Sequence, residues 1–143
     1  MPRTNETAFL IWSLQNSGAG TTITTSGNSG SYTSTTPNAR TAVDLRWADD
    51  LWLSVIATGG AGTALTAQLN LYDNQGNLYQ FLTGTTPLLG VTLASAPNRG
   101  IAFAGRHGGG GGGQNYIVPS EWGQVAWALT GTMTGVEIAL YGR

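Results

Sequence analysis

The chain has 143 residues and a formal net charge of −1, with 9% charged side chains, a single His, and neither Cys nor Lys. The missing Cys excludes disulfides, thiol catalysis and zinc–thiolate sites, and the lack of a basic run argues against nucleic acid as a partner. Catalysis needs groups that titrate or attack, and the few present here are scattered. We therefore expect a protein that is not an enzyme and has no cofactor, metal site or catalytic residue.

A chain of this length is the size of one ordinary domain and can bury a core without disulfides or metals. Its surface has few charges to keep a monomer soluble. We therefore expect copies of the chain or another protein to cover much of that surface.

The first seven residues, 1–7, are polar, and we expect them to form an extended N-terminal arm before a single domain at 8–143. An arm that orders on assembly gains backbone pairing with a neighbouring sheet edge. The residues expected to make such intermolecular contacts are Pro2, Arg3, Thr4 and Asn5. The apolar run 8–12 is too short for a signal or membrane segment, which predicts synthesis in a cytoplasm and no membrane partner.

Residues 8–15 are predicted to form a strand with apolar side chains on both faces, so both faces are expected to be covered. The next stretch, 16–38, consists almost wholly of Ser, Thr, Gly and Asn. Long excursions of this kind are uncommon in compact domains and are often functional. We expect either a long surface hairpin or a segment that orders against a neighbour.

Four segments of alternating apolar and polar residues then predict β-strands, because successive side chains of a strand point to opposite faces. They are residues 41–47, 51–58, 65–72 and 77–83. Between them, 49–50 and 73–76 predict turns, and 59–62 predicts a flexible connection. In the second turn, the Asp73 side chain is expected to start the turn and Gly76 to supply a positive φ.

Shorter strands are predicted around 91–93 and 101–104, followed by alternating strands at 125–129 and 136–140. No stretch shows a sustained 3.6-residue apolar period, so no helix is expected. About eight to ten short strands separated by turn residues are typical of an antiparallel β-sandwich, a jelly roll or a small barrel. We predict an all-β fold of this class.

His107 stands beside six consecutive glycines, 108–113, in a Gly-rich loop predicted at 105–115. A phosphate-binding loop also needs a Lys and a following helix, and a metal site needs ligands besides a lone His. The sequence supplies neither. A glycine tract leaves the backbone free to fit another surface, so we expect an exposed loop whose functional contact would be with a neighbouring subunit.

Five Trp residues are many for a chain of this length. Four of them, Trp12, Trp47, Trp52 and Trp127, lie in predicted strands, where we expect core or interface anchors. Trp122 lies in a predicted turn and is the better candidate for an exposed ring. An exposed ring with Asn and Asp nearby also suits stacking against a sugar, which leaves a glycan partner open.

The polar arm, the polar excursion 16–38, the charge-poor Thr/Gly strands and the last strands at 124–129 and 136–141 resemble the small all-β virion proteins of tailed bacteriophages. The resemblance is in particular to head decoration (capsid cement) proteins. It rests on features spread over the whole chain and not on a motif, so it assigns no site residue. It implies a β-rich body on the virion surface, often a homotrimer, that is made in the host cytoplasm. Such a body binds across junctions between major capsid protein subunits.

Two other functions fit the same composition. A tail, baseplate or fibre protein would differ from a decoration protein in its location on the particle. A carbohydrate-binding β-sandwich module would present an exposed Trp platform. Both remain alternatives at the level of sequence.

Overall fold

The computed structural model describes residues 8–14, 21–30, 42–73, 75–80, 82–83, 86–87, 89–105 and 121–143. Five of the candidate contact residues lie outside these ranges: Pro2, Arg3, Thr4, Asn5 and His107. The glycine tract 108–113 lies outside them as well. The predictions for the N-terminal arm and for the Gly-rich loop therefore stay predictions.

Every regular element of the described residues is a β-strand, which confirms the predicted all-β class. Two antiparallel sheets pack against each other as a sandwich, and β9 and β10 form a separate two-stranded ribbon. The strands are β1 (Phe9–Ser13), β2 (Thr21–Ile23), β3 (Gly27–Asn28), β4 (Val43–Asp44), β5 (Asp50–Ala57), β6 (Gly59–Gly60), β7 (Ala64–Tyr72), β8 (Leu78–Tyr79), β9 (Leu82–Thr83), β10 (Thr86–Pro87), β11 (Gly90–Leu93), β12 (Asn98–Gly105), β13 (Trp122–Thr130) and β14 (Met133–Gly142).

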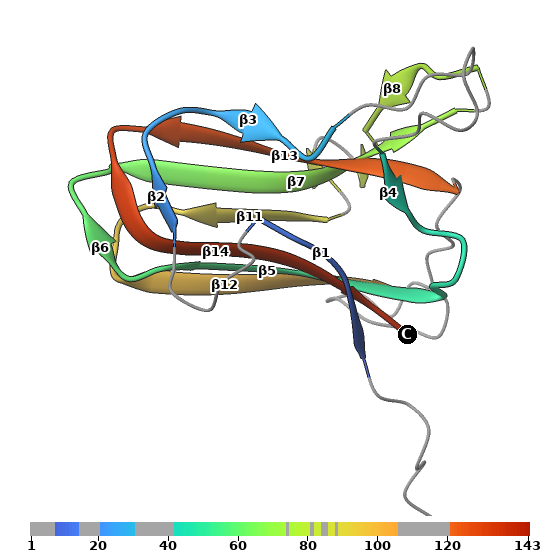
Figure 1. The fold of residues 1–143 in the computed structure, drawn as a ribbon, viewed down its shortest axis with the longest axis horizontal. Coiled ribbons are helices and arrows are strands. Elements are labelled where there is room, and N and C mark those ends of the chain that lie inside the picture. Colours follow the sequence, from blue (N-terminus) through green and yellow to red (C-terminus); the bar gives the residue numbers. More distant parts are fainter. Residues whose placement is uncertain are drawn as a thin grey trace, which may run out of the picture.

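The spatial order of the strands gives the sandwich the connectivity of a jelly roll. The first sheet runs β1-β14-β5-β12, and the second runs β11-β7-β13-β3, with β4 also paired to β13. The chain crosses from one sheet to the other between most of its successive long strands, and the first strand lies beside the last. Figure 1 shows the two layers, with β14 and β5 in one and β13 and β7 in the other. Two interlocked Greek keys of this kind define the jelly roll.

The core lies between the two sheets and follows the predicted alternation. In β5, positions 51, 53, 55 and 57 are buried while the positions between them are only half-buried. Trp12 and Trp127 stack at 6.1 Å between ring centroids and pack against this core, as predicted for two of the strand tryptophans. The largest fully buried side chains are Leu51, Leu53, Leu65, Leu89, Leu93, Met133, Ile138, Leu140, Val55, Val125 and Val136.

At one end of the sandwich, short connections carry the chain between the sheets. β13 and β14 follow each other in sequence but lie in different sheets, so their connection is not a hairpin. The stretch 59–62 is not the flexible link that its glycines predict, because β6 pairs with β14. The Gly62 N–H also donates to the carbonyl of Thr132 over 2.7 Å.

The described part of the polar excursion, residues 21–30, joins the edges of both sheets and does not form a hairpin of its own. β2 pairs with β14 in the first sheet, and β3 pairs with β13 in the second. The hydroxyl oxygens of Ser26 and Ser29 accept hydrogen bonds from the backbone N–H groups of Leu129 (3.0 Å) and Val125 (2.9 Å). Short hydroxyl side chains suit this task because they can bond directly to backbone groups.

A buried polar cluster on the second sheet holds Gly30, the last described residue of this excursion. Gln124 is 6% exposed, and its Nε2 donates to the Gly30 carbonyl over 3.1 Å and to the Tyr72 hydroxyl over 3.2 Å. Asn70, equally buried, accepts a hydrogen bond of 3.0 Å from the Gln68 amide. Buried amides need such partners to offset their lost hydration.

The two predicted turns have different outcomes. The turn at 73–76 is confirmed, because Asp73 Oδ1 accepts the N–H groups of Gln75 (2.9 Å) and Asn77 (2.8 Å), and Gly76 has a φ of 88°. At 49–50 the prediction is wrong for Asp50, which begins β5 and is 2% exposed. Backbone hydrogen bonds with Arg143 place Asp50 in the sheet. No local sequence pattern predicts this contact.

Candidate interaction surface

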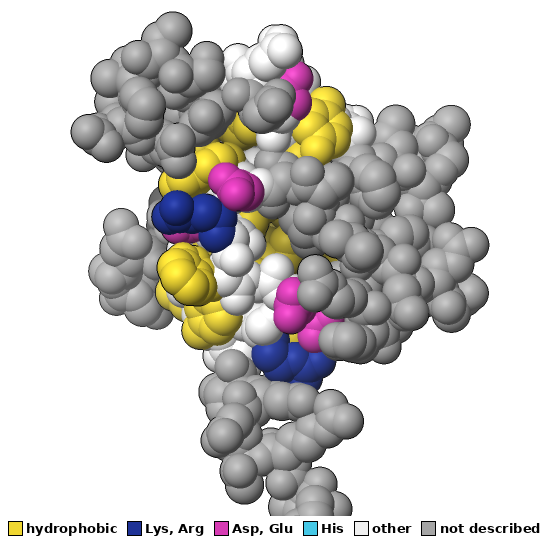
Figure 2. All heavy atoms as spheres, turned by 90° about the vertical axis from the view of Figure 1, so that its right-hand side faces the viewer, with side chains coloured by type: hydrophobic (Ala, Val, Ile, Leu, Met, Phe, Trp, Pro, Cys, Tyr) yellow, Lys and Arg dark blue, Asp and Glu magenta, His cyan; other side chains and the backbone are white. Residues whose placement is uncertain are grey.

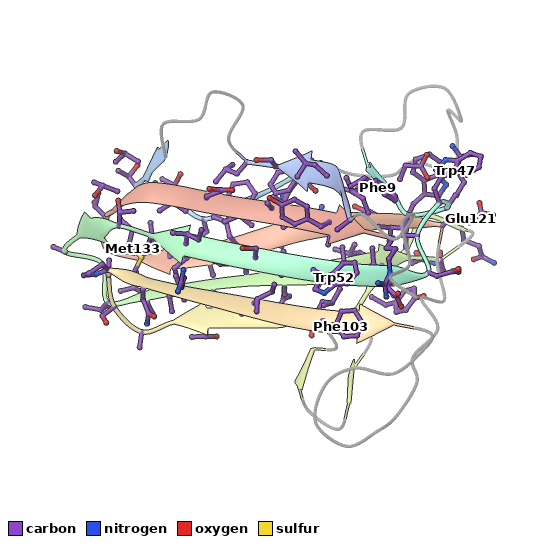
Figure 3. The ribbon with its side chains drawn as sticks, turned by 90° about the horizontal axis from the view of Figure 1, so that it is seen from below. Phe9, Trp47, Trp52, Phe103, Glu121 and Met133 are labelled. Carbon is purple, nitrogen blue, oxygen red and sulfur yellow. The ribbon has the colours of Figure 1, made fainter. Side chains whose placement is uncertain are left out.

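Trp47 is the exposed indole of the molecule. All five Trp residues are described, and Trp47, in the connection between β4 and β5, is 79% exposed while the other four are half-buried. The expectation of a strand position for Trp47 is wrong, because the chain turns at 46–47 after the alternation has buried Val43 and Leu45. Figure 3 shows Trp47 near Glu121 at the end of the sandwich opposite Met133.

Trp122 is not the exposed turn residue that the sequence predicts. It begins β13, is half-buried, and pairs with Asp44 of β4. The guanidinium carbon of Arg46 lies 4.8 Å from its ring centroid, a cation–π distance. Pairing with β4, almost eighty residues earlier in the chain, is what removes this ring from the surface.

Arg46 is held in place beside Trp47 by a bidentate ion pair. Its Nε donates to Asp44 Oδ1 over 3.0 Å, and its Nη2 donates to Asp44 Oδ2 over 2.8 Å. The pKa of Arg46 lies above its usual value, chiefly because the Asp44 side chain accepts these hydrogen bonds. The result is an exposed ring next to a charged pair whose donors and acceptors are oriented. We name Asp44, Arg46, Trp47 and Trp122 the Trp47 cluster.

A second surface feature crosses the outer face of the first sheet. The strand registers place four residues side by side in one row: Leu10 opposite Tyr141, Tyr141 opposite Trp52, and Trp52 opposite Phe103. Leu10 is 55% exposed, and the rings of Trp52 and Phe103 lie 5.0 Å apart. We name these four residues the outer row.

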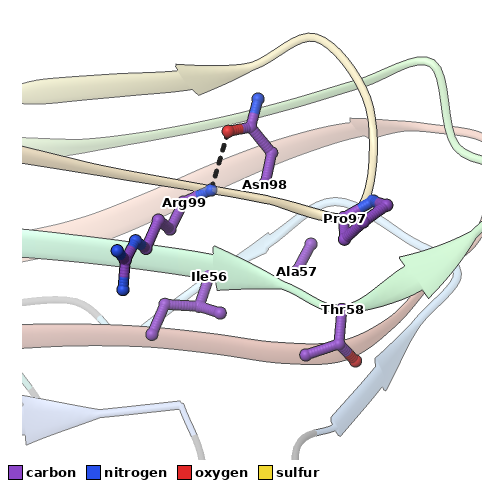
Figure 4. Close-up of a pocket in the computed structure, with 6 residues that line it drawn as sticks. All are labelled: Ile56, Ala57, Thr58, Pro97, Asn98 and Arg99. Carbon is purple, nitrogen blue, oxygen red and sulfur yellow. Dashed lines mark hydrogen bonds between the residues drawn. The ribbon is translucent and has the colours of Figure 1, made fainter.

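On the same face, the next position of β12 along the sheet from Phe103 also carries an apolar side chain. Ile101 lies opposite Ser54 there and is 69% exposed. Beyond it lies a shallow, open depression with one hydrogen bond, from the Arg99 N–H to Asn98 Oδ1 over 2.8 Å, as Figure 4 shows. Its lining residues are Ile56, Ala57, Thr58, Pro97, Asn98 and Arg99.

An ion pair lies between the outer row and the Trp47 cluster. Arg143 Nη2 donates to the buried Asp50 carboxylate over 2.7 Å, and its guanidinium carbon lies 5.4 Å from the Trp52 ring centroid. Figure 2 looks onto this end of the sandwich and shows basic, acidic and hydrophobic side chains close together. In both ion pairs the opposite charges already contact each other, so a partner would meet mainly aromatic rings and apolar side chains on this surface.

Metal-binding groups and membrane-spanning helices were both sought among the described residues. These residues contain no group of three or more His, Asp or Glu side chains placed to hold a metal ion. The same residues include no helix that meets the length and hydropathy of a membrane span. The prediction that the protein is not an enzyme stays a prediction.

Leu10, Ile101 and the outer row as a unit were not predicted from the sequence. A signal was present, because the outward positions of the alternating strands carry Trp52, Phe103 and Tyr141 where a solvated sheet face usually carries polar residues. Recognising it required the pairing of four strands from distant parts of the chain.

Comparisons of the chain with protein-family models, with curated proteins and with solved structures yield no match.

Proposed function

We propose that this protein is a structural protein of a bacteriophage virion, which decorates the capsid and stabilises it by binding across capsid-subunit junctions. The outer row, with Ile101 beside it, is the observation that supports a binding surface on this protein. An apolar face on a charge-poor domain favours a protein interface, because covering it removes apolar area from water.

Two further points support a role in assembly. The jelly roll recurs in viral capsid proteins and in lectins, an argument by analogy at the level of the fold. The resemblance of the sequence to decoration proteins supports the capsid as the partner. With a net charge of −1, the protein meets little long-range repulsion on approaching a protein lattice.

The first test is to locate the protein on particles. Virions purified from the source that encodes the chain are labelled with antibody against it and viewed by electron microscopy. Label over the head supports the proposal, label on the tail supports the tail, baseplate or fibre alternative, and its absence from particles overturns both.

The second test asks whether the outer row makes the contact. Capsids lacking the protein are mixed with wild type or with Leu10→Gln, and the bound protein is measured after sedimentation. We expect Leu10→Gln to weaken binding about tenfold, since full burial of an apolar side chain contributes roughly 1.5–3 kcal/mol and Leu10, which is 55% exposed, has about half of this left to gain. Thr92→Gln, an exposed change on the other sheet, is the matched control and should bind like wild type. Equal binding of all three proteins would remove the outer row from the interface.

Carbohydrate binding is the second candidate function, and the 79% exposed Trp47 ring beside the Arg46–Asp44 pair favours it. A pyranose ring would stack on the indole while the pair oriented its hydroxyl groups. Titration of Trp fluorescence with the glycans found on an array should show saturation in wild type and none in Trp47→Ala. An array without hits removes this candidate.

A further inference from the structure

The edges of the two sheets differ in how they are protected against pairing with another chain. Natural edge strands are usually short, bulged, charged or covered. β11 has four residues, β3 and β4 have two each, and the register of β1 shifts between Leu10 and Trp12. β12 has eight residues and keeps an unbroken register with β5 over its whole length.

The composition of β12 also lacks the usual protection. Among the residues that the structure describes, β12 pairs only with β5. The strand contains no Pro and no Lys, Arg99 is its one charged residue, and Ile101 in its middle is 69% exposed. A long, regular and nearly uncharged edge of this kind favours the addition of another strand through backbone hydrogen bonds.

We propose that β12 pairs antiparallel with β12 of a second copy of the chain, around a two-fold axis at Ile101. The first sheets of the two protomers then form one continuous sheet. A two-fold interface requires a self-complementary surface, and β12 provides one. In this register, Ile101 faces its own counterpart, and Arg99 of each protomer faces Phe103 of the other.

The charge pattern favours this register over one centred on Arg99. Arg99 opposite an aromatic ring gains a cation–π contact, and that ring already lies 5.0 Å from Trp52 in the same protomer. Pairing centred on Arg99 would instead place two guanidinium groups against each other. A second copy of the chain supplies both an edge of equal length and the ring that Arg99 faces.

This pairing does not depend on the proposed capsid role. It uses Ile101 and Phe103 at the sheet edge and leaves Leu10 free, so loss of capsid binding in Leu10→Gln leaves the mass of the assembly unchanged. It also differs from the homotrimer that the sequence resemblance implies, because two identical edges that pair around a two-fold axis close as a dimer.

The sharpest test uses single cysteines, because the chain contains none. In Ile101→Cys, the two-fold axis places the two Cα atoms about 4.5–5.5 Å apart, within the span of a disulfide. The matched control is Ser54→Cys, at the position paired with Ile101 on the same face. Its two copies would be three strand spacings, about 14 Å, apart, too far for a disulfide.

We expect Ile101→Cys to become a covalent dimer under mild oxidation while Ser54→Cys stays uncrosslinked. In light scattering, wild type and Ser54→Lys should show a concentration-dependent dimer, and Ile101→Lys a monomer, because two ammonium groups would meet at the axis. Retention of the far-ultraviolet circular dichroism spectrum checks that each variant folds. A wild-type monomer or trimer mass, or equal crosslinking of the two cysteine variants, would overturn the proposal.

Discussion

Arg143 and Asp50 form an ion pair in which 2.7 Å separate Nη2 from Oδ2, and the two residues also exchange backbone hydrogen bonds of 3.0 Å in both directions. The Asp50 side chain is 4% exposed and the Arg143 side chain 35%. The pair fixes the end of β14 against the start of β5. It thereby fixes Trp52 of the outer row, over which the guanidinium lies.

Replacing Arg143 should destabilise the fold. Arg143→Gln leaves the buried Asp50 carboxylate without this counter-ion, and we expect a loss of about 2 kcal/mol, below the range for fully buried pairs because Arg143 is partly solvated. Urea unfolding followed by circular dichroism measures the loss. Arg46→Gln, which breaks the exposed Arg46–Asp44 pair, is the control and should leave the midpoint nearly unchanged. Equal effects of the two variants would contradict this assignment.

Removal of the Ser29 hydroxyl should loosen the link between the polar excursion and β13. Ser29→Ala leaves the N–H of the fully buried Val125 without its 2.9 Å acceptor, which should cost about 1 kcal/mol. Hydrogen exchange followed by NMR should show faster exchange at the Val125 amide. Ser26→Ala should have a smaller effect, since its partner Leu129 is only half-buried. Unchanged exchange at Val125 would argue against the hydroxyl bond.

The 73–76 turn should make stability depend on acidic pH. The pKa of Asp73 is lowered, first by the hydrogen bond from the Asn77 side chain and then by backbone N–H groups. A depressed native pKa stabilises the fold above the unfolded value of about 3.9, and this stabilisation is lost as pH falls through the native pKa. The urea midpoint should therefore fall with pH below about 4 in wild type, less in Asn77→Ala and least in Asp73→Asn. Identical pH profiles would sink this account.

A Cβ atom at position 135 in β14 should strain the contact with Thr58, which follows β5. Gly135 has a φ of 59°, and an added Cβ would collide with Thr58 Oγ1. We expect Gly135→Ala to cost about 2 kcal/mol or more, because a left-handed backbone and a steric clash act together. Thermal unfolding measures it, and Thr58→Ala in the same chain should recover part of the loss. Gly59→Ala, without a positive φ, should cost less; the reverse order would refute the argument.

The sequence predicts well what depends on neighbouring residues. Alternation places Leu51, Leu53 and Val55 in the core, because period two puts every second side chain on the same face. The turn at 73–76 follows from an Asp side chain that bonds to the backbone and a Gly that adopts positive φ. The same reasoning fails for Trp47, in the turn after β4, and for Trp122, at the start of β13, because the exposure of a ring at such positions depends on what packs beside it.

An all-β chain, the inward rows of its long strands and the chemistry of one turn can be predicted from the sequence, because these depend on contacts within a few residues. The pairing of distant strands depends on the packing of the whole chain, and the jelly roll, the outer row and the long edge of β12 all follow from that pairing. Asp50 and Arg143 are 93 residues apart in sequence, and their contact depends on the packing of the whole sandwich. Closing so long a loop is favourable only when many other contacts form with it, so no local pattern could reveal it.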